Sequence, residues 1–73
     1  MDPFAEKIYV LTHDGDSWED IVIYTTEVEA INASMKNPMC RVEVFMKNGE
    51  EYKGGYFPTY NYYRQGSYIS KYK

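Results

Sequence analysis

The segment TTEVEAINASMKNPMCRVEVFM, residues 25–46, decides the fold, because a helix signal in it leads directly to a strand signal. Thr26 and Glu29 have the spacing of a capping box, in which the Thr hydroxyl takes the Glu amide and the Glu carboxylate reaches back to the Thr amide. This pattern predicts that the helix starts at Thr26. Pro38 disfavours helical backbone at the residue before it, so we expect the helix to end at Asn37.

The predicted helix is amphipathic and has about three turns, too few to be stable without tertiary packing. Three of its apolar residues recur at helical period, and we expect this stripe to face the core; they are Val28, Ile31 and Met35. Further along, Val42, Val44 and Met46 alternate with other residues, which is typical of a strand with one face towards the helix. The sequence therefore predicts a helix packed on a sheet.

Four strands are expected. Residues 7–12, KIYVLT, and 20–25, DIVIYT, are rich in β-branched and aromatic side chains and predict the first two strands. The third spans residues 40–47. The Asn-Gly dipeptide at 48–49 accepts the positive φ angles of a type I′ turn, so we expect a hairpin there and a fourth strand from residue 50 to about 56.

A hairpin, a helical crossover and a second hairpin predict an α+β domain of ββαββ topology, with one helix packed on one face of a four-stranded antiparallel sheet. A right-handed crossover that passes over the first strand gives the spatial order 2-1-3-4. Residues 1–73 then form a single domain, with the core in residues 6–56 and a Tyr- and Lys-rich C-terminal extension in residues 57–73. The helix-free face should leave several side chains partly bare, such as those of Tyr9, Leu11, Val22, Tyr24 and Phe45.

Cysteine content and hydropathy favour a cytoplasmic protein. Cys40 is the single cysteine, so no intrachain disulfide can form, and the N-terminus lacks the basic and apolar runs of a secretory signal. No apolar run approaches the roughly 20 residues needed to cross a bilayer. We therefore expect no membrane association.

The net charge of −3 is unevenly distributed along the chain. Residues 1–29 carry eight acids and one base, whereas residues 30–73 carry seven bases and three acids. Two interpretations remain open: the two halves attract each other within the fold, or the basic half meets an anionic partner.

The C-terminal segment, residues 52–73, holds seven tyrosines and four basic residues and no acid. Gln65-Gly66 predicts a turn within it, and the segment forms either a third hairpin or an arm. Its tyrosines could pack the open sheet face, or they could bind a protein partner or a second copy of the chain; the residues expected to do so are Tyr56, Phe57, Tyr60, Tyr62, Tyr63, Arg64 and Tyr68. Aromatic rings interleaved with cations also suit single-stranded nucleic acid, through the same rings and through Lys53, Arg64, Lys71 and Lys73.

The sequence offers one arrangement for catalysis and one for a metal. His13 and Cys40 are the only base and nucleophile of the cysteine type, and the expected topology brings them near each other. A loop histidine and a small buried thiol is the simpler interpretation, because no oxyanion site or substrate pocket is visible. The acids of the first loop lack the calcium-loop pattern, so we expect a solvated turn, no metal and no cofactor; they are Asp14, Asp16, Glu19 and Asp20.

Four stretches carry a resemblance to a known group of proteins: IYVLTHDGDSWED at 8–20, TTEVEAINAS at 25–34, RVEVF at 41–45 and PTYNYY at 58–63. Together they resemble small uncharacterised proteins of nucleocytoplasmic large DNA viruses. The resemblance implies a compact viral accessory or particle protein, in the host cell cytoplasm or the virion, and it assigns no residue a role. Separately from the resemblance, the acid-free aromatic segment beside an otherwise acidic domain leads us to expect a small non-enzymatic interaction module that binds a protein partner or itself through its Tyr-rich surface.

Overall fold

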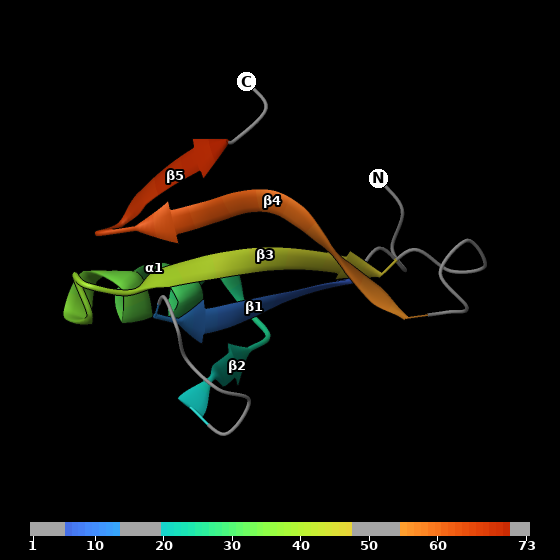
Figure 1. Cartoon of the computed structure of the whole chain (residues 1–73), viewed down its shortest axis with the longest axis horizontal. Coiled ribbons are helices and arrows are strands. Elements are labelled where there is room, and N and C mark those ends of the chain that lie inside the picture. The colour runs from blue at the N-terminus through green and yellow to red at the C-terminus, as the bar shows by residue number, and fades with distance from the viewer. Residues whose placement is uncertain (1–5, 14–19, 48–54, 71–73) are drawn as a thin grey trace.

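The computed structural model describes residues 6–13, 20–47 and 55–70, and within them the chain forms one helix on one face of a five-stranded sheet (Figure 1). All neighbouring strands are antiparallel and the spatial order is β2-β1-β3-β4-β5. The elements are β1 (Lys7–Thr12), β2 (Val22–Tyr24), α1 (Glu27–Lys36), β3 (Arg41–Lys47), β4 (Tyr56–Arg64) and β5 (Ser67–Ser70). The predicted α+β class and the order 2-1-3 are confirmed. The fourth strand lies beside β3 as expected, but it is formed by Tyr56–Arg64 and not by residues 50–56, and a fifth strand follows it.

Both ends of α1 lie where the sequence predicted them. Thr26 is the N-cap, and its hydroxyl accepts a hydrogen bond from the Glu29 amide at 3.2 Å. The return bond differs from a full capping box, because the Thr26 hydroxyl itself donates to the Glu29 carboxylate at 3.0 Å. Asn37 caps the C-terminus, donating to the Ala33 carbonyl from its backbone at 3.0 Å and from its side chain at 2.8 Å.

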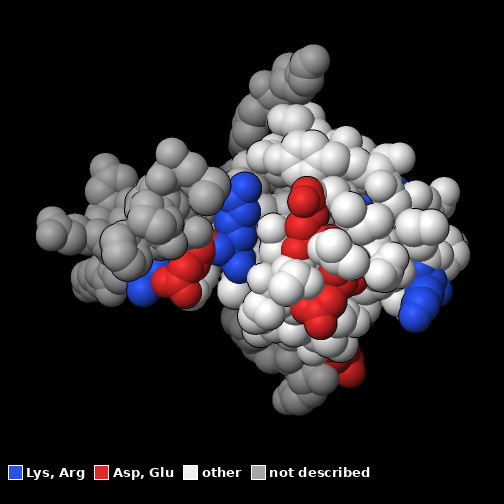
Figure 2. Space-filling model, turned by 180° about the vertical axis from the view of Figure 1, so that it is seen from behind, with Lys and Arg blue, Asp and Glu red and all other residues white. Residues whose placement is uncertain are grey.

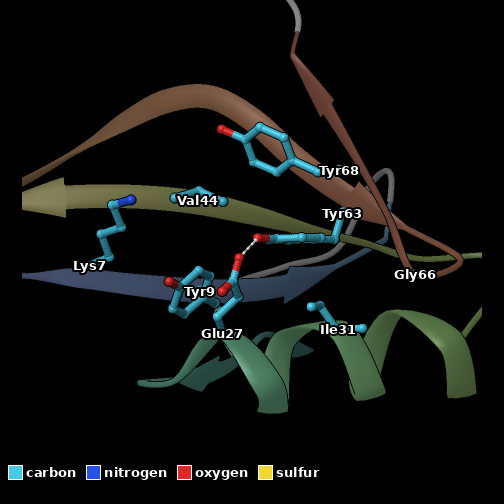
Figure 3. Close-up of a pocket in the computed structure, with 8 residues that line it drawn as sticks. All are labelled: Lys7, Tyr9, Glu27, Ile31, Val44, Tyr63, Gly66 and Tyr68. Atoms are coloured by element: carbon cyan, nitrogen blue, oxygen red, sulfur yellow. Dashed lines mark hydrogen bonds between the residues drawn. The ribbon is translucent and has the colours of Figure 1, made fainter.

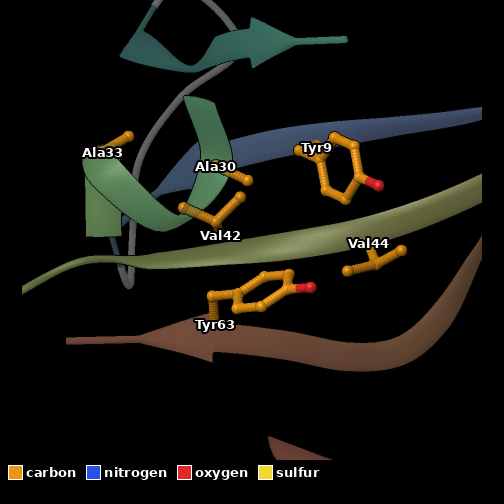
Figure 4. Close-up of a cluster of buried hydrophobic side chains, with 6 residues drawn as sticks. All are labelled: Tyr9, Ala30, Ala33, Val42, Val44 and Tyr63. Atoms are coloured by element: carbon orange, nitrogen blue, oxygen red, sulfur yellow. The ribbon is translucent and has the colours of Figure 1, made fainter. Parts of the chain in front are cut away.

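The helix packs on the sheet mainly through small residues, and of its expected apolar stripe only Ile31 packs against the core, where it is partly buried. Ala30, Ala33 and Ser34 are the buried residues of α1, whereas Val28 and Met35 are 67% and 59% exposed. Small side chains let a helix lie close to a sheet, and close contact over a wide area stabilises more than the burial of two larger side chains held further away. The buried cluster joins these alanines to four sheet residues, Tyr9, Val42, Val44 and Tyr63 (Figure 4).

Ser34 fixes how the helix is rotated. It is fully buried, and its hydroxyl donates to the Ile31 carbonyl at 2.8 Å and accepts from the Gly66 amide at 2.9 Å. A buried hydroxyl without partners would be costly, so these two bonds hold this side of α1 against the turn between β4 and β5.

The strand register corrects the expected use of the two sheet faces. Tyr9 pairs with Val44 and Leu11 pairs with Val42, so both side chains of β1 lie on the helix-covered face and were wrongly expected on the bare one. Tyr24 pairs with Tyr9 and also packs against the buried cluster. Because β1 is apolar on both faces, its alternation could not show which face meets the helix.

Val22 and Phe45 were also expected on the bare face, and only Phe45 lies there. Val22 pairs with Leu11 and so shares the helix side, at the edge of the sheet, where it is 44% exposed. Phe45 pairs with Ile8 and with Pro58 on the helix-free face, as expected.

The expected C-terminal extension forms two strands. β4 begins at Tyr56, where the predicted fourth strand ended, and the Asn-Gly turn at 48–49 lies outside the described residues. The turn at Gln65-Gly66 is confirmed: both residues have positive φ angles, 52° and 84°, as a two-residue type I′ hairpin requires. Of the two possibilities left open by the sequence, the third hairpin is therefore the correct one.

Pro58 is accommodated in β4 because β5 pairs with only residues 61–64 of that strand. Between Pro58 and Tyr62 the pairing with β3 shifts register, and Tyr60 takes a positive φ of 68°. The Thr59 hydroxyl donates to the Val44 carbonyl at 2.8 Å inside this bulge. A bulge of this kind bends a strand, which agrees with the curved course of β4 (Figure 1).

We predict that Ala30→Leu lowers the free energy of unfolding by about 1–3 kcal/mol, because Ala30 is fully buried and a larger side chain would push α1 away from the sheet. Val28→Ala should change it by less than about 0.5 kcal/mol, since Val28 is exposed. Urea unfolding followed by circular dichroism measures both. Equal losses in the two variants would show that the helix uses its apolar stripe after all.

Candidate functional site

The structure divides the Tyr-rich binding residues between the two sheet faces. Tyr63 and Tyr68 pair across β4 and β5 and lie on the helix-covered side. Tyr63 is buried there, at 5% exposed, so its ring belongs to the core and is not displayed on the surface. Tyr62 and Arg64 alternate with Tyr63 along β4 and therefore lie on the helix-free face. These residues do not form one continuous surface.

The remaining three predicted residues lie in the first half of β4. Tyr56 and Tyr60 are exposed, and Phe57 is half-buried. The bulge of β4 opens a groove of about 580 Å³, which is lined by Met46, Phe57, Pro58, Thr59, Tyr60 and Asn61. The Tyr56 hydroxyl lies 3.5 Å from the Glu6 carboxylate, to which it donates.

The residues expected for nucleic acid cannot be brought together from the described part of the chain. Lys53, Lys71 and Lys73 lie outside it, and Arg64 is half-buried on the helix-free face. Lys47 lies 3.5 Å from Glu6, an ion pair that joins the basic and acidic halves of the chain.

A second groove lies on the helix-covered side of the sheet, between α1 and the β4–β5 hairpin (Figure 3). We call it the Tyr groove. It has a volume of about 470 Å³ and takes its lining from one helix and four strands or their turns: Lys7, Tyr9, Glu27, Ile31, Val44, Tyr63, Gly66 and Tyr68.

Three tyrosine rings form one wall and the floor of the Tyr groove. The Tyr63 ring lies between the other two, with its centroid 6.4 Å from that of Tyr9 and 5.1 Å from that of Tyr68. Both pairs are tilted, by 56° and 57°, which is a favourable arrangement for aromatic rings. Tyr9 and Tyr63 are buried whereas Tyr68 is 55% exposed, so Tyr68 is the most accessible of the three to a ligand.

The Tyr63 hydroxyl donates a hydrogen bond of 2.5 Å to the Glu27 carboxylate (Figure 3). Glu27 stands in the first turn of α1, where a negative charge is favoured by the helix dipole. Burial, followed by this bond and the charge of Glu27, raises the pKa of Tyr63. Burial, then the charge of Glu27, likewise raises the pKa of Tyr9. Both phenols are therefore neutral at neutral pH, beside a carboxylate held in a fixed position.

The apolar stripe of α1 borders the Tyr groove. Ile31, its central member, lines the groove, and helical spacing places Val28 and Met35 along the same edge. The Met35 side chain lies against the turn between β4 and β5. It is so close to Gly66 that a Cβ atom added to this glycine would be only 2.9 Å from the Met35 Cγ. The stripe that was expected to fill the core thus provides an exposed apolar rim to this groove.

Figure 2 shows the helix-covered face, with acidic side chains near its middle and basic side chains on either side of them. The acids of α1 are Glu27 and Glu29, both in its first turn. Within the groove itself, Glu27 and Lys7 are the two charged residues of the lining, and Figure 3 shows Lys7 at the end towards which the Tyr9 and Tyr68 hydroxyls point.

The structure tests only the placement of the candidate catalytic pair. Thr12 pairs with Arg41 at the ends of β1 and β3, and His13 and Cys40 are the residues that follow and precede this pair in the sequence. Their proximity stays a prediction. Neither residue lines the Tyr groove or the groove of the β4 bulge.

Among the described residues no group of three or more metal-binding side chains occurs. Of the acids in the first loop, Asp20 is exposed, and Asp14, Asp16 and Glu19 lie outside the described part of the chain.

Sequence reasoning missed most of the Tyr groove. Lys7 and Tyr9 come from the first strand and Glu27 from the first turn of the helix, and none of the three was expected to bind a ligand. One signal was available: Tyr9 lies on a strand that is apolar on both faces, so at least one of its faces had to meet another element.

A scan against protein-family models, a search of curated proteins and a search of solved structures each gave no significant match. The resemblance to proteins of large DNA viruses therefore stays a prediction. In the described part of the chain, α1 is the sole helix, and it has neither the length nor the apolar character to cross a membrane.

We predict that Tyr63→Phe lowers the free energy of unfolding by roughly 1 kcal/mol at neutral pH, because the bond to Glu27 is lost while the ring is kept. Since the pKa of Tyr63 is raised in the folded state, its contribution is present below the unfolded pKa of about 10 and is lost as the pH rises above that value. The wild-type protein should therefore lose stability more steeply than the variant above about pH 10.

Urea unfolding at a series of pH values, with Tyr56→Phe as the control, measures this difference. Tyr56 is exposed and its bond to Glu6 is long, so its removal should leave the pH dependence close to that of the wild type. Parallel curves for the wild type and Tyr63→Phe would contradict the role given to this hydrogen bond.

Proposed function

We propose that this chain is a small non-enzymatic interaction module, which holds a segment of a partner protein in the Tyr groove. The observation that carries the proposal is an exposed apolar rim beside a groove with fixed polar groups. Binding sites commonly combine apolar and aromatic walls with a few placed polar groups that set orientation and specificity.

The rim has the composition of an interface. Val28, Met35 and Tyr68 are all more than half exposed, and Ile31 lies between them in the groove wall. Tyrosine and methionine are enriched in protein interfaces, because each covers a large area and adapts to the shape of a partner. Binding would remove these side chains from water, at roughly 25 cal/mol for each Å² of apolar surface.

The chemistry of the groove favours binding over bond making. A raised pKa keeps the hydroxyls of Tyr9 and Tyr63 protonated, so neither supplies a phenolate nucleophile near neutral pH. The Glu27 carboxylate accepts from Tyr63, which orients it as a hydrogen-bond acceptor. Such groups are suited to recognising donors on a ligand.

A segment of another protein fits the groove better than a small molecule does. The groove is open along the apolar stripe of α1, and that stripe continues beyond the groove lining at both Val28 and Met35. An extended or helical segment could contact the rim and the groove together, as in helix-in-groove recognition. A small ligand in such an open groove would be in contact with the protein on few sides.

We predict that peptides selected from a random displayed library against the whole chain lose affinity about tenfold or more with Tyr68→Ala. The matched control is Tyr56→Ala, which removes another exposed tyrosine of the hairpin that does not line the Tyr groove; its effect should be less than about twofold. Fluorescence anisotropy of the labelled peptides gives both affinities.

Two results would overturn the proposal. In the first, the selection against the folded protein enriches no peptide beyond those that a parallel selection against heat-unfolded protein also enriches. In the other, the enriched peptides bind Tyr68→Ala as well as they bind the wild type. Sedimentation equilibrium run beside it tests self-association: a dimer that Ile31→Glu dissociates would show that the groove is occupied by a second copy and not by a partner.

A further inference from the structure

We propose that the Glu27 end of the Tyr groove receives a basic side chain, lysine or arginine, of the partner segment. This inference rests on the proposed function and adds the chemistry of the partner. It is carried by a carboxylate that is hydrogen-bonded to Tyr63, in a groove that an exposed aromatic ring, that of Tyr68, also lines.

Glu27 is positioned before any ligand arrives. Its first helical turn is capped by Thr26, and its carboxylate accepts from the buried Tyr63 hydroxyl at 2.5 Å. A carboxylate has about four acceptor positions, so one phenol leaves room for the N–H donors of an ammonium or a guanidinium group. A side chain that is already oriented loses little entropy on binding, which raises the benefit of each new bond.

Tyr68 supplies the second contact. Tyr68 is 55% exposed, and its ring lies against that of Tyr63, the residue whose hydroxyl bonds to Glu27. The face of a tyrosine ring attracts cations, and the attraction adds to that of a nearby carboxylate. Glu27 and Tyr68 both contact Tyr63 and line the same groove, so a cation bound to Glu27 occupies the groove that also presents the Tyr68 ring.

The surrounding charge favours the same sign of ligand. Glu29 stands in the same helical turn as Glu27, and the whole chain carries a net charge of −3. Lys7 is the opposing charge in the lining, and no ion pair joins it to Glu27 in the described part of the chain. The partner's basic side chain is thus expected at Glu27 and away from Lys7, so that charge complementarity sets the direction of the bound segment.

The test titrates the isotopically labelled protein with blocked peptides that differ only at the centre: Gly-Leu-Lys-Leu-Gly, Gly-Leu-Gln-Leu-Gly and Gly-Leu-Glu-Leu-Gly. Amide shifts in the nuclear magnetic resonance spectrum report where each binds. The Lys peptide should shift Glu27, Ile31 and Tyr68 and bind most tightly. Glu27→Gln should weaken it about fivefold and leave the Gln peptide unchanged.

Glu29→Gln is the matched control, since it removes one negative charge from the same turn and keeps a residue suited to the capping position. It should weaken the Lys peptide less than about twofold, because it acts only through the general field. Lys7→Gln should leave the Lys peptide bound as tightly as before or more tightly.

The possible failures separate the two proposals. If the Lys and Gln peptides shift the groove residues with equal affinity, or if Glu27→Gln and Glu29→Gln act equally, the basic-residue inference is wrong while binding in the groove stands. If the Glu peptide binds most tightly and Lys7→Gln abolishes it, the groove prefers an acid. If no peptide shifts groove residues, or if butylammonium alone binds as tightly as the Lys peptide, a protein segment is not the ligand.

Discussion

The close contact between α1 and the sheet through Ala30, Ala33 and Ser34 is the constraint on which the rest of this structure depends. Two of these residues are fully buried and the third nearly so, and none has a side chain longer than a hydroxymethyl group. A helix that rests on such residues lies near the strands and can bury its backbone as well as its side chains. The buried hydroxyl of Ser34 then fixes the rotation of the helix about its axis, because this hydroxyl has its hydrogen-bond partners at Ile31 and Gly66.

This rotation of the helix determines what the surface displays. With the small residues turned inward, helical geometry turns Val28 and Met35 outward and leaves Ile31 at the boundary. The same rotation points Glu27 at the Tyr63 hydroxyl on β4. The apolar rim of the Tyr groove and its fixed carboxylate therefore have one cause, the rotation of the helix.

Local signals predicted the local structure well. The Thr26 cap, the end at Asn37 and the turn at Gln65-Gly66 each depend on residues that are near each other in sequence, and each is found where it was expected. The order of the first four strands followed from the connections and from the handedness of crossovers. These features need no knowledge of which side chains meet across the fold.

The sequence could not show which face of the helix packs on the sheet or which residues of distant strands pair. Two faces of α1 could have packed on the sheet, and hydrophobicity favoured the face with valine, isoleucine and methionine, whereas close approach favours the face with two alanines and a serine. The Tyr groove depends on that choice and on the pairing of Tyr63 with both Val42 and Tyr68, 21 and 5 positions away in the chain. Its residues therefore carry no common motif, and only Tyr63 and Tyr68 were among those expected to bind.

The bond between Tyr63 and Glu27 also limits how a ligand can use this site. A donor that displaced the Tyr63 hydroxyl would leave a buried phenol without its acceptor, and the cost of that loss would offset much of the new bond. A donor that instead adds to the remaining acceptor positions keeps the existing bond and gains its own. The arrangement thus favours a ligand that approaches Glu27 from the open side, past the exposed Tyr68 ring, and a long flexible side chain such as that of lysine or arginine can reach the carboxylate by this route while its aliphatic part covers the ring.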